Sequence, residues 1–458
     1  MIDEAEQLKF IDLFSGLGGF HEGLSSLNFE CVFASEIDLS LRSLYADNFK
    51  IEPAGDIREI NAEDIPEHDL LCAGFPCQPF SKAGSQNGMN DLHRGTLFDD
   101  ISRIIKFHKP KYFILENVAN LKNHDRGRTW DIISHTLEDI LGYEIDNRKL
   151  SPHLFGIPQI RERIFIVGAR DGLTHFSWPE PLENSKLSID NILEPISTTT
   201  KYLPARESTC LDLWQEFVDR VPANIELPSF PIWTMEFGAD YPIDQKAPYH
   251  LKREELDDYL GSFGQSLHGM TKHDQLERLP KYARTEQENE EFPKWKQRFI
   301  LQNREYYNRI KKYVDPVLPE IQKMPPSWQK FEWNCKGESR NIRSHIVQFR
   351  GSGIRVKRRN YSPALVASTS TQIPIIGWEN RYISIKEASK LQSLERLKMP
   401  NQFGTAFKAL GNAVNARIVS LIAEELIKES SPTSLKHNKN INGIMQTNQV
   451  PISKAVES

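Results

Sequence analysis

The sequence predicts an α/β fold: a doubly wound, mostly parallel sheet, together with a second domain that is smaller and less regular. Short apolar runs alternate with helical patterns over residues 9–170, and such alternation is typical of a parallel sheet with crossover helices. From about residue 172 the alternation stops, and it returns only after about residue 375. We therefore expect a first domain, an irregular second domain, a segment that returns to the first domain and a disordered tail, at residues 1–171, 172–395, 396–428 and 429–458.

The bulk composition excludes several classes of protein. Charged residues make up 26% and hydrophobic residues 39% of the 458 residues, as in a soluble globular protein, and no apolar run approaches the ~18 residues of a membrane span. The acidic start of the chain lacks the apolar core of a signal peptide. Five scattered cysteines fit neither a disulfide framework nor a zinc site, so we expect a reduced, cytoplasmic protein without a metal. The net charge of −5 still permits a local basic face for nucleic acid.

A glycine turn follows the first predicted strand, at residues 9–14. Strand, glycine turn and helix form a unit that cradles nucleotides, because glycines let the backbone approach a ligand. Gly16 and Gly18 match the dinucleotide pattern, but His21 stands at its third glycine, which argues against NAD. The next strand, at 30–35, ends in Glu36, about 18 residues after the glycines, where a carboxylate accepts from ribose hydroxyls. Asp56 could accept from an adenine amino group, or serve as a turn residue.

The stretch 74–81 is the one around which the chain is organised. It follows a short apolar run at 70–73, which predicts a buried strand. Cys77 therefore stands at the carboxyl end of a strand, between two prolines that stiffen its backbone, and this is where open α/β sheets bind ligands. A single cysteine is more often an ordinary buried residue. The other motifs of this chain favour a reactive role.

Further polar residues follow later strands of the first domain. Residues 96–99 have the form of a capping box that starts a helix. Glu116 ends the strand at 111–115, where burial would raise its pKa and suit it to act as an acid; a salt-bridged structural glutamate is the alternative. Gln159, Arg161 and Arg163 alternate ahead of an apolar run at 164–168, which predicts that they share one face. Three long donors suit an anionic or carbonyl-rich ligand, or a surface ion-pair cluster.

Two basic stretches mark the second domain. Residues 294–313 carry seven Lys and Arg against one Glu, with an apolar stripe at helical spacing that includes Trp295 and Ile310 and predicts a core-facing side. Residues 335–360 carry eight Lys and Arg against one Glu, as contact with phosphate requires, although such runs are usually only solvated. Beyond them, a short helix is expected at 385–394, and a further helix after residues 409–414.

Taken together, these segments resemble the cytosine-C5 DNA methyltransferase family, above all the bacterial modification enzymes, and they stand in the family's order. Residues 10–20 resemble the first cofactor motif, Glu36 and Asp56 the second and third, and residues 74–81 the Pro-Cys nucleophile motif. The later catalytic motifs, the ninth and the tenth are matched at 95–98, 116–118, 159–163, 381–394 and 411–414. Two departures stand out. Ile37 replaces an aromatic residue that stacks on adenine in many members, and the ninth motif contains Ile383-Ser384-Ile385 in place of Leu-Thr-Pro.

The resemblance implies a Rossmann-like S-adenosylmethionine methyltransferase domain and a smaller, irregular target-recognition domain. It assigns catalysis to Cys77 as the nucleophile at C6 of cytosine, Glu116 at N3 and Arg163 at O2, with Arg161 as structural or phosphate support. It assigns S-adenosylmethionine to eleven residues: Phe14, Leu17, Gly19, Glu36, Ile37, Asp56, Ile57, Pro76, Leu97, Asn412 and Val414. For DNA we expect contacts from Lys82, Ser85 and Gln86 beside the flipped base, and from Arg350, Arg355, Lys357 and Arg358.

The activity implied is transfer of a methyl group to C5 of a flipped-out cytosine at a short specific site in double-stranded DNA. The protein is expected to be a monomer and to pair functionally with a restriction endonuclease, without a metal or a membrane. Three alternatives remain: a tRNA cytosine methyltransferase with the same core, an NAD-dependent oxidoreductase, and a catalytically dead DNA-binding relative. The recognition segment of roughly 200 residues argues against the first, the incomplete glycine pattern against the second, and intact Cys77, Glu116 and Arg163 against the third.

Overall fold

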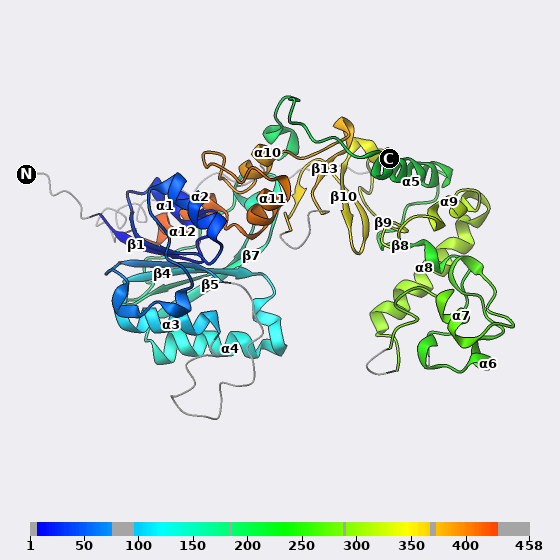
Figure 1. The fold of residues 1–458 in the computed structure, drawn as a ribbon, viewed down its shortest axis with the longest axis horizontal. Coiled ribbons are helices and arrows are strands. Elements are labelled where there is room, and N and C mark those ends of the chain that lie inside the picture. The colour runs from blue at the N-terminus through cyan, green and yellow to red at the C-terminus, as the bar shows by residue number, and fades with distance from the viewer. Residues whose placement is uncertain are drawn as a thin grey trace, which may run out of the picture.

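The computed structural model describes residues 7–75, 96–182, 186–244, 246–286, 290–366 and 372–428, which form two lobes (Figure 1). The first lobe contains a six-stranded sheet in the order β2-β1-β3-β4-β7-β5. The first four strands are parallel, and β7 runs antiparallel to both of its neighbours. In that order the strands span Glu30–Ser35, Lys9–Leu13, Leu70–Gly74, Tyr112–Val118, Arg163–Ala169 and Glu144–Leu150.

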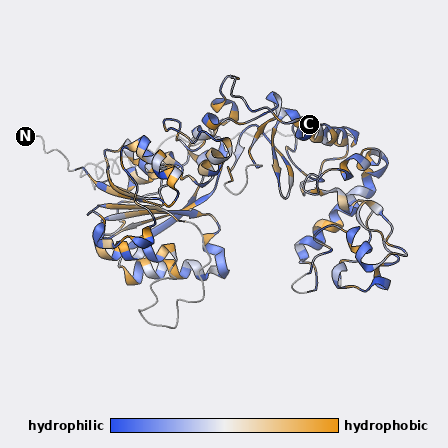
Figure 2. Cartoon of the chain, in the orientation of Figure 1, coloured by the Kyte–Doolittle hydropathy of each residue, from blue (hydrophilic) through white to orange (hydrophobic). Residues whose placement is uncertain are grey.

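Helices cover both faces of this sheet, so the predicted doubly wound α/β fold is confirmed. Side chains alternate along each strand, and Phe10, for example, faces one helical layer while Ile11 faces the other. Figure 1 shows α1 and α12 on one side and α3 and α4 on the other. In Figure 2 these helices are striped blue and orange, as amphipathic helices are. The helices of this lobe are α1 Gly19–Ser25, α2 Leu39–Phe49, α3 Leu97–His108, α4 Arg128–His135, α11 Phe403–Asn412 and α12 Ala416–Leu426.

Most predicted elements of the first lobe form at or near the predicted residues. The strand predicted at 30–35 forms there, and the capping box at Thr96 and Asp99 starts α3. Helix α12 returns to the first lobe and packs against α1, as expected for the C-terminal segment. Helix α11 was not predicted. The predictions for the Cys77 segment and for the disordered tail concern residues 76–95 and 429–458, which lie outside the described residues.

The sequence predicted that Gln159, Arg161 and Arg163 alternate along one strand and share one face, and this prediction is wrong. Strand β6 (Gln159–Ile160) ends before Arg161, and β7 begins at Arg163. The strand is interrupted at Arg161, because the Arg161 amide donates to Ser151 Oγ (2.9 Å) and not to a neighbouring strand. Strand β6 then pairs with β12 (Ser362–Pro363), so this segment joins the two lobes.

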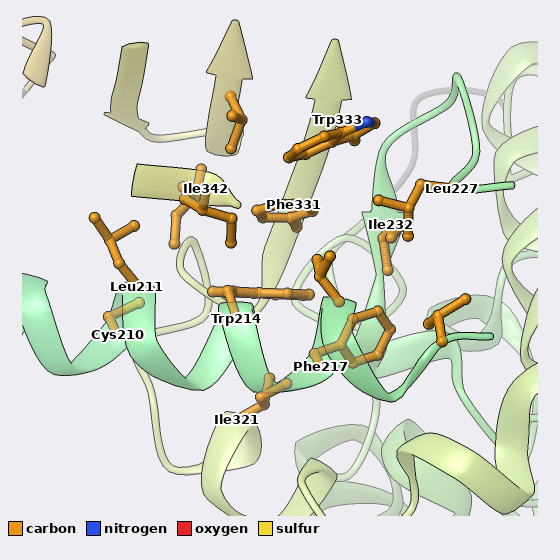
Figure 3. Close-up of a cluster of buried hydrophobic side chains, with 14 of the residues drawn as sticks. Cys210, Leu211, Trp214, Phe217, Leu227, Ile232, Ile321, Phe331, Trp333 and Ile342 are labelled. Atoms are coloured by element: carbon orange, nitrogen blue, oxygen red, sulfur yellow. The ribbon is translucent and has the colours of Figure 1, made fainter. Parts of the chain in front are cut away.

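The second lobe is built on a second six-stranded sheet, in the order β14-β13-β10-β11-β9-β8. Its apolar face packs against helix α5 (Ala205–Arg220), where Trp214 stacks on Phe331 with ring centroids 4.7 Å apart (Figure 3). In sheet order the strands span Arg381–Tyr382, Ile375–Ile376, Ile346–Arg350, Gly353–Lys357, Lys330–Asn334 and Ile232–Trp233. The remaining helices are α6 Arg253–Leu256, α7 Lys272–Glu277, α8 Lys294–Val314, α9 Leu318–Gln322 and α10 Ile385–Lys390.

Helix α8 coincides with the basic stretch predicted to be helical. Its core face contains Ile300, Tyr306 and Ile310, in agreement with the predicted apolar stripe. Trp295 is an exception, because 52% of this residue is exposed. The stripe therefore turns away from the core in the first turn of the helix.

Candidate active site

A cavity of about 700 Å³ lies at the carboxyl ends of the first strands of the first sheet, and its volume is typical of a ligand site. It is lined by most of the residues predicted for cofactor and catalysis: Phe14, Gly19, Glu36, Ile37, Asp56, Ile57, Leu97, Glu116, Arg161, Arg163, Asn412 and Val414. Leu17 does not line it, because its side chain is buried in a hydrophobic cluster instead. Pro76, Cys77, Lys82, Ser85 and Gln86 lie outside the described residues.

The glycine turn forms one wall of the cavity. Phe14, Gly16 and Gly18 all have positive φ angles (58°, 55° and 84°), so the backbone bends sharply between β1 and α1. Gly19 is needed for close packing, because a Cβ there would lie 2.4 Å from the carbonyl oxygen of Val414. The turn is therefore held directly against the C-terminal segment, which brings two distant motifs to one site.

Polar atoms of the turn and of β2 face the same space. The Glu36 carboxylate accepts from the amides of Gly16 and Asp38, both at 2.9 Å, which fixes its orientation. The hydroxyls of Ser15 and Ser35 are buried and have no hydrogen-bond partner among the described residues. Since buried hydroxyls without partners are costly, these two suit a polar ligand in the cavity. Sequence reasoning missed them, although both flank motifs that it had identified.

Asp56 is a turn residue whose position also faces the cavity. It caps a short helical turn (Ile57–Glu59), and it also lines the cavity. Its carboxylate accepts two hydrogen bonds from Arg58 Nε at 2.9 Å, and these bonds hold the pKa of Asp56 below its ordinary value. Arg58, which sequence reasoning did not consider, therefore keeps an acceptor ionised at the rim of the cavity.

Glu116 lies on β4 at the inner wall of the cavity, 7% exposed. Burial raises the pKa of its carboxyl above the ordinary value, although Arg163 and Arg161 act in the opposite direction. Arg163 Nε lies 3.0 Å from Glu116 Oε1. The acid and the cation that were predicted from separate motifs thus meet in one place, and the carboxyl there is disposed to hold a proton.

Arg161 has a structural position. It is 3% exposed, and its guanidinium donates to the carbonyls of Gly411 (2.8 Å), Ala413 (3.0 Å) and Leu365 (3.1 Å). Burial lowers the pKa of Arg161 to about 9. These contacts support the structural role considered for Arg161, because its guanidinium ties together three backbone carbonyls.

Asn117 connects the acid to the stretch that carries Cys77. Its Nδ2 donates to the carbonyl of Phe75 at 3.0 Å, two residues before Cys77. Asn117 is buried, so this hydrogen bond is protected from water. The contact ties the end of β4 to the end of β3, from which the Cys77 segment departs. Sequence reasoning named only the neighbouring Glu116.

Four basic residues predicted to contact DNA, Arg350, Arg355, Lys357 and Arg358, lie on or directly beside the second sheet, and three of them are ion-paired. Arg350 and Arg355 both contact Glu332, at 3.3 and 2.5 Å, and Arg358 contacts Glu338 at 3.4 Å. Lys357 makes no ion pair with any described residue. Its position on β11 beside Arg355 keeps three cations close to one carboxylate, so this part of the sheet is locally basic.

Sequence comparison places the first lobe among known enzymes. The sequence profile described as "C-5 cytosine-specific DNA methylase" matches residues 8–227. Type II methyltransferase M.HhaI of Haemophilus parahaemolyticus is 45% identical over 222 residues, which cover 48% of this chain and 67% of that protein. Type II methyltransferase M.HpaII of Haemophilus parainfluenzae is 46% identical over 202 residues, 43% of this chain and 56% of that protein. A mutant of DNMT2 from Spodoptera frugiperda superposes with a TM-score of 0.47 at 16% identity, covering 92% of this chain and all of that one.

The matched region covers only part of those relatives, between about half and two thirds of each. The profile match covers the first lobe without α11 and α12, together with the start of the second lobe. No helix among the described residues is long and apolar enough to cross a membrane. Within the same residues, no group of three or more His, Cys, Asp or Glu side chains is arranged to hold a metal ion.

Proposed function

The chain belongs to the C-5 cytosine-specific DNA methylases, a family of DNA (cytosine-5-)-methyltransferases, and we propose that its cavity binds S-adenosylmethionine and a cytosine flipped out of double-stranded DNA. The observation that carries the proposal is the position of Glu116 and Arg163. They stand 3.0 Å apart in the wall of the same cavity that the glycine turn lines. One cavity thus offers a nucleotide cradle and an acid–cation pair.

The residues present fit S-adenosylmethionine. The two unpartnered hydroxyls, Ser15 Oγ and Ser35 Oγ, suit the polar groups of this cofactor. Glu36 would hold the ribose hydroxyls and Asp56 the adenine amino group, with Ile37, Ile57 and Leu97 as apolar contacts. When bound, S-adenosylmethionine supplies a methyl group on a positively charged sulfur, which is a good leaving group.

The protein must make C5 of cytosine nucleophilic, because this carbon is unreactive in the free base. The Cys77 thiolate adds to C6, forming an S–C bond and moving the C5–C6 electron pair into an enamine. Glu116, whose pKa burial raises, donates its proton to N3 and so removes the negative charge that develops on the ring. Arg163 donates to O2 from the same wall. After methylation at C5, loss of the C5 proton expels Cys77 and restores the aromatic ring.

Access to C5 requires that the base leave the duplex, at a cost of a few kcal/mol. We assign Lys82, Ser85 and Gln86 to the gap left in the duplex and residues 172–395 to target recognition, with Arg350, Arg355, Lys357 and Arg358 as DNA contacts. The relatives named above are Type II methyltransferases. We accordingly propose that this chain protects host DNA as the partner of a restriction endonuclease, and that it acts as a cytoplasmic monomer.

Methyl transfer from labelled S-adenosylmethionine tests the proposal. The purified chain is incubated with duplex DNA, with tRNA and with duplex DNA that carries 5-fluorocytosine. We expect label in duplex DNA and a denaturation-resistant complex on the fluorinated duplex. The complex persists because C5 carries fluorine in place of the proton whose removal releases Cys77. The Cys77→Ala variant should form no such complex. Label only in tRNA, or NAD binding without methyl transfer, would support the alternative enzymes.

A further inference from the structure

The polar face of the second sheet contains an arrangement of charges that the proposed chemistry does not use. Strands β9, β10 and β11 place Glu332, Gln348 and Arg355 side by side, because Arg355 is in register with both of the others. Arg350 and Lys357 lie on the same face, since each is two residues from one of these positions. The opposite face carries the apolar core of Figure 3.

Among the described residues, the hydrogen bonds of Arg355 use only the inner nitrogen of its guanidinium. Its Nε donates to Glu332 Oε2 at 2.5 Å. Neither Nη1 nor Nη2 of Arg355 donates to any other described residue. Arg350, on β10, contacts the same carboxylate through Nη1 at 3.3 and 3.4 Å. Glu332 therefore fixes the side chain of Arg355 by its inner nitrogen and presents the two outer nitrogens as a fork.

We propose that Arg355, held by Glu332, reads the major-groove edge of a guanine in the target site, and that Glu332 is the residue that positions it. This inference rests on the proposed function, since it assumes a duplex DNA substrate. The two free nitrogens match O6 and N7 of guanine, and this bidentate contact is the commonest specific one between arginine and a base. Because the fork is already fixed, little side-chain entropy is lost when it binds.

The same charges argue against a simple phosphate contact. Glu332 is a carboxylate with only 13% of its side chain exposed, and it lies directly beside the fork. Its negative charge offsets that of the arginine it holds, so the fork attracts a phosphate less strongly than a free guanidinium would and keeps its hydrogen-bond geometry for a neutral base. Lys357 lies on the same face of β11 and makes no ion pair with any described residue. Lys357 is therefore the better candidate for the phosphate beside this base.

Methylation of a randomised duplex pool, read by bisulfite sequencing, tests the proposal. The wild-type chain first defines the site. Arg355→Lys is then expected to lower discrimination at one G·C position by about 5- to 150-fold, the range that corresponds to one bidentate contact. Glu332→Ala should relax the same position, and Glu332→Gln, which keeps an acceptor, should restore part of the discrimination. Arg343→Lys is the matched control, because Arg343 pairs with Asp212 on the α5 side of the lobe.

Three outcomes would overturn the proposal. The first is that Arg355→Lys leaves every position unchanged. The second is that Arg355→Lys weakens methylation equally at all sites and reduces the salt dependence of binding, as loss of a phosphate contact does. The third is that Glu332→Ala relaxes a different position from Arg355→Lys, which would remove the positioning role. If the wild-type chain methylates no cytosine in any duplex, the proposed function itself fails, and this result is distinct from the other three.

Discussion

The two lobes each contain a glutamate–arginine pair across neighbouring strands, and the pairs differ in which partner is constrained. On the first sheet Arg163 lies 3.0 Å from Glu116, in the wall of a cavity where burial raises the pKa of the acid. On the second sheet Arg355 lies 2.5 Å from Glu332, which a second arginine, Arg350, also contacts. One acid is buried beside a ligand cavity; the other is shared between two cations.

This difference decides which member of each pair is free to act. A buried carboxyl with a raised pKa can hold and donate a proton, and its arginine moderates that tendency. A carboxylate shared between two arginines serves as an anchor, so the outer edge of one arginine becomes the working group. The same two residue types therefore suit acid catalysis in one lobe and base recognition in the other.

The largest effect is expected from Glu116→Gln. Glutamine cannot donate a proton to N3 as an acid does, so the methylation rate constant should fall by about 10²- to 10⁴-fold, the range for general acid catalysis. Single-turnover methyl transfer at saturating DNA measures it. Glu216→Gln is the matched control, because Glu216 pairs with Arg220 on the surface of α5. Equal rates for both variants would refute the assignment of Glu116.

Removal of the cationic partner should have the next largest effect. Arg163→Ala deletes a donor to O2, and loss of one such donor costs about 10²- to 10³-fold in rate. It should also raise the pKa of Glu116 further, since the cation that opposes the effect of burial is gone. The rate and circular dichroism of the variant check this together. A folded variant with the wild-type rate would contradict the role of Arg163.

The pH dependence of the methylation rate distinguishes Glu116 from Glu332. Because burial raises the pKa of Glu116, the protonated form persists to higher pH, and the rate should fall as pH rises through that pKa, at most about tenfold per pH unit. This alkaline limb should vanish in Glu116→Gln and remain in Glu332→Gln. A limb that is identical in all three proteins would assign the titration to another group.

Asp12 shows what burial does to an acid that has no cationic partner among the described residues. It is fully buried on β1, and burial raises its pKa to about 8. Between pH 4 and 8 the folded protein holds this proton and the unfolded chain does not, so Asp12 makes stability fall as pH rises, by up to about 1.4 kcal/mol per pH unit. Denaturant unfolding of wild type and Asp12→Asn across that range measures the difference. Parallel pH profiles would show that Asp12 is ionised in the fold.

The smallest effect is expected from Lys357→Ala. Loss of one phosphate contact lowers the slope of log K against log salt by about 0.9 and weakens binding to all duplexes equally. Filter binding at several salt concentrations measures this slope. A change in base preference without a change in slope would assign base reading to Lys357 instead of Arg355.

Much of the first lobe could be predicted, because its strands are short apolar runs bounded by turns. The runs at 30–35 and 70–73 became β2 and β3 almost residue for residue. The break at Arg161 could not be predicted, since it depends on a hydrogen bond to Ser151, ten residues earlier in the chain. Helix α11 was missed although Phe403, Phe407 and Leu410 recur at helical spacing, a signal that could have found it.

The ion pairs of the second lobe could not be predicted from local sequence patterns. The basic run at 335–360 indicated free cations, but Glu332 lies just before it and reaches Arg355 only because β9 and β11 pair in parallel. Glu116 and Arg163 likewise meet through the pairing of β4 with β7, while their separate motifs predicted only their types. The types of residue at the site could thus be predicted from the motifs. Which residues pair with one another could be known only from the sheet topology.

Bisulfite sequencing of plasmid DNA from cells that express this chain tests the central claim most directly, with Cys77→Ala as the control. We predict protected cytosines in one short repeated context, all of them absent from the control. Protection that persists in Cys77→Ala, or no protected cytosine although the folded protein is present, would contradict the account.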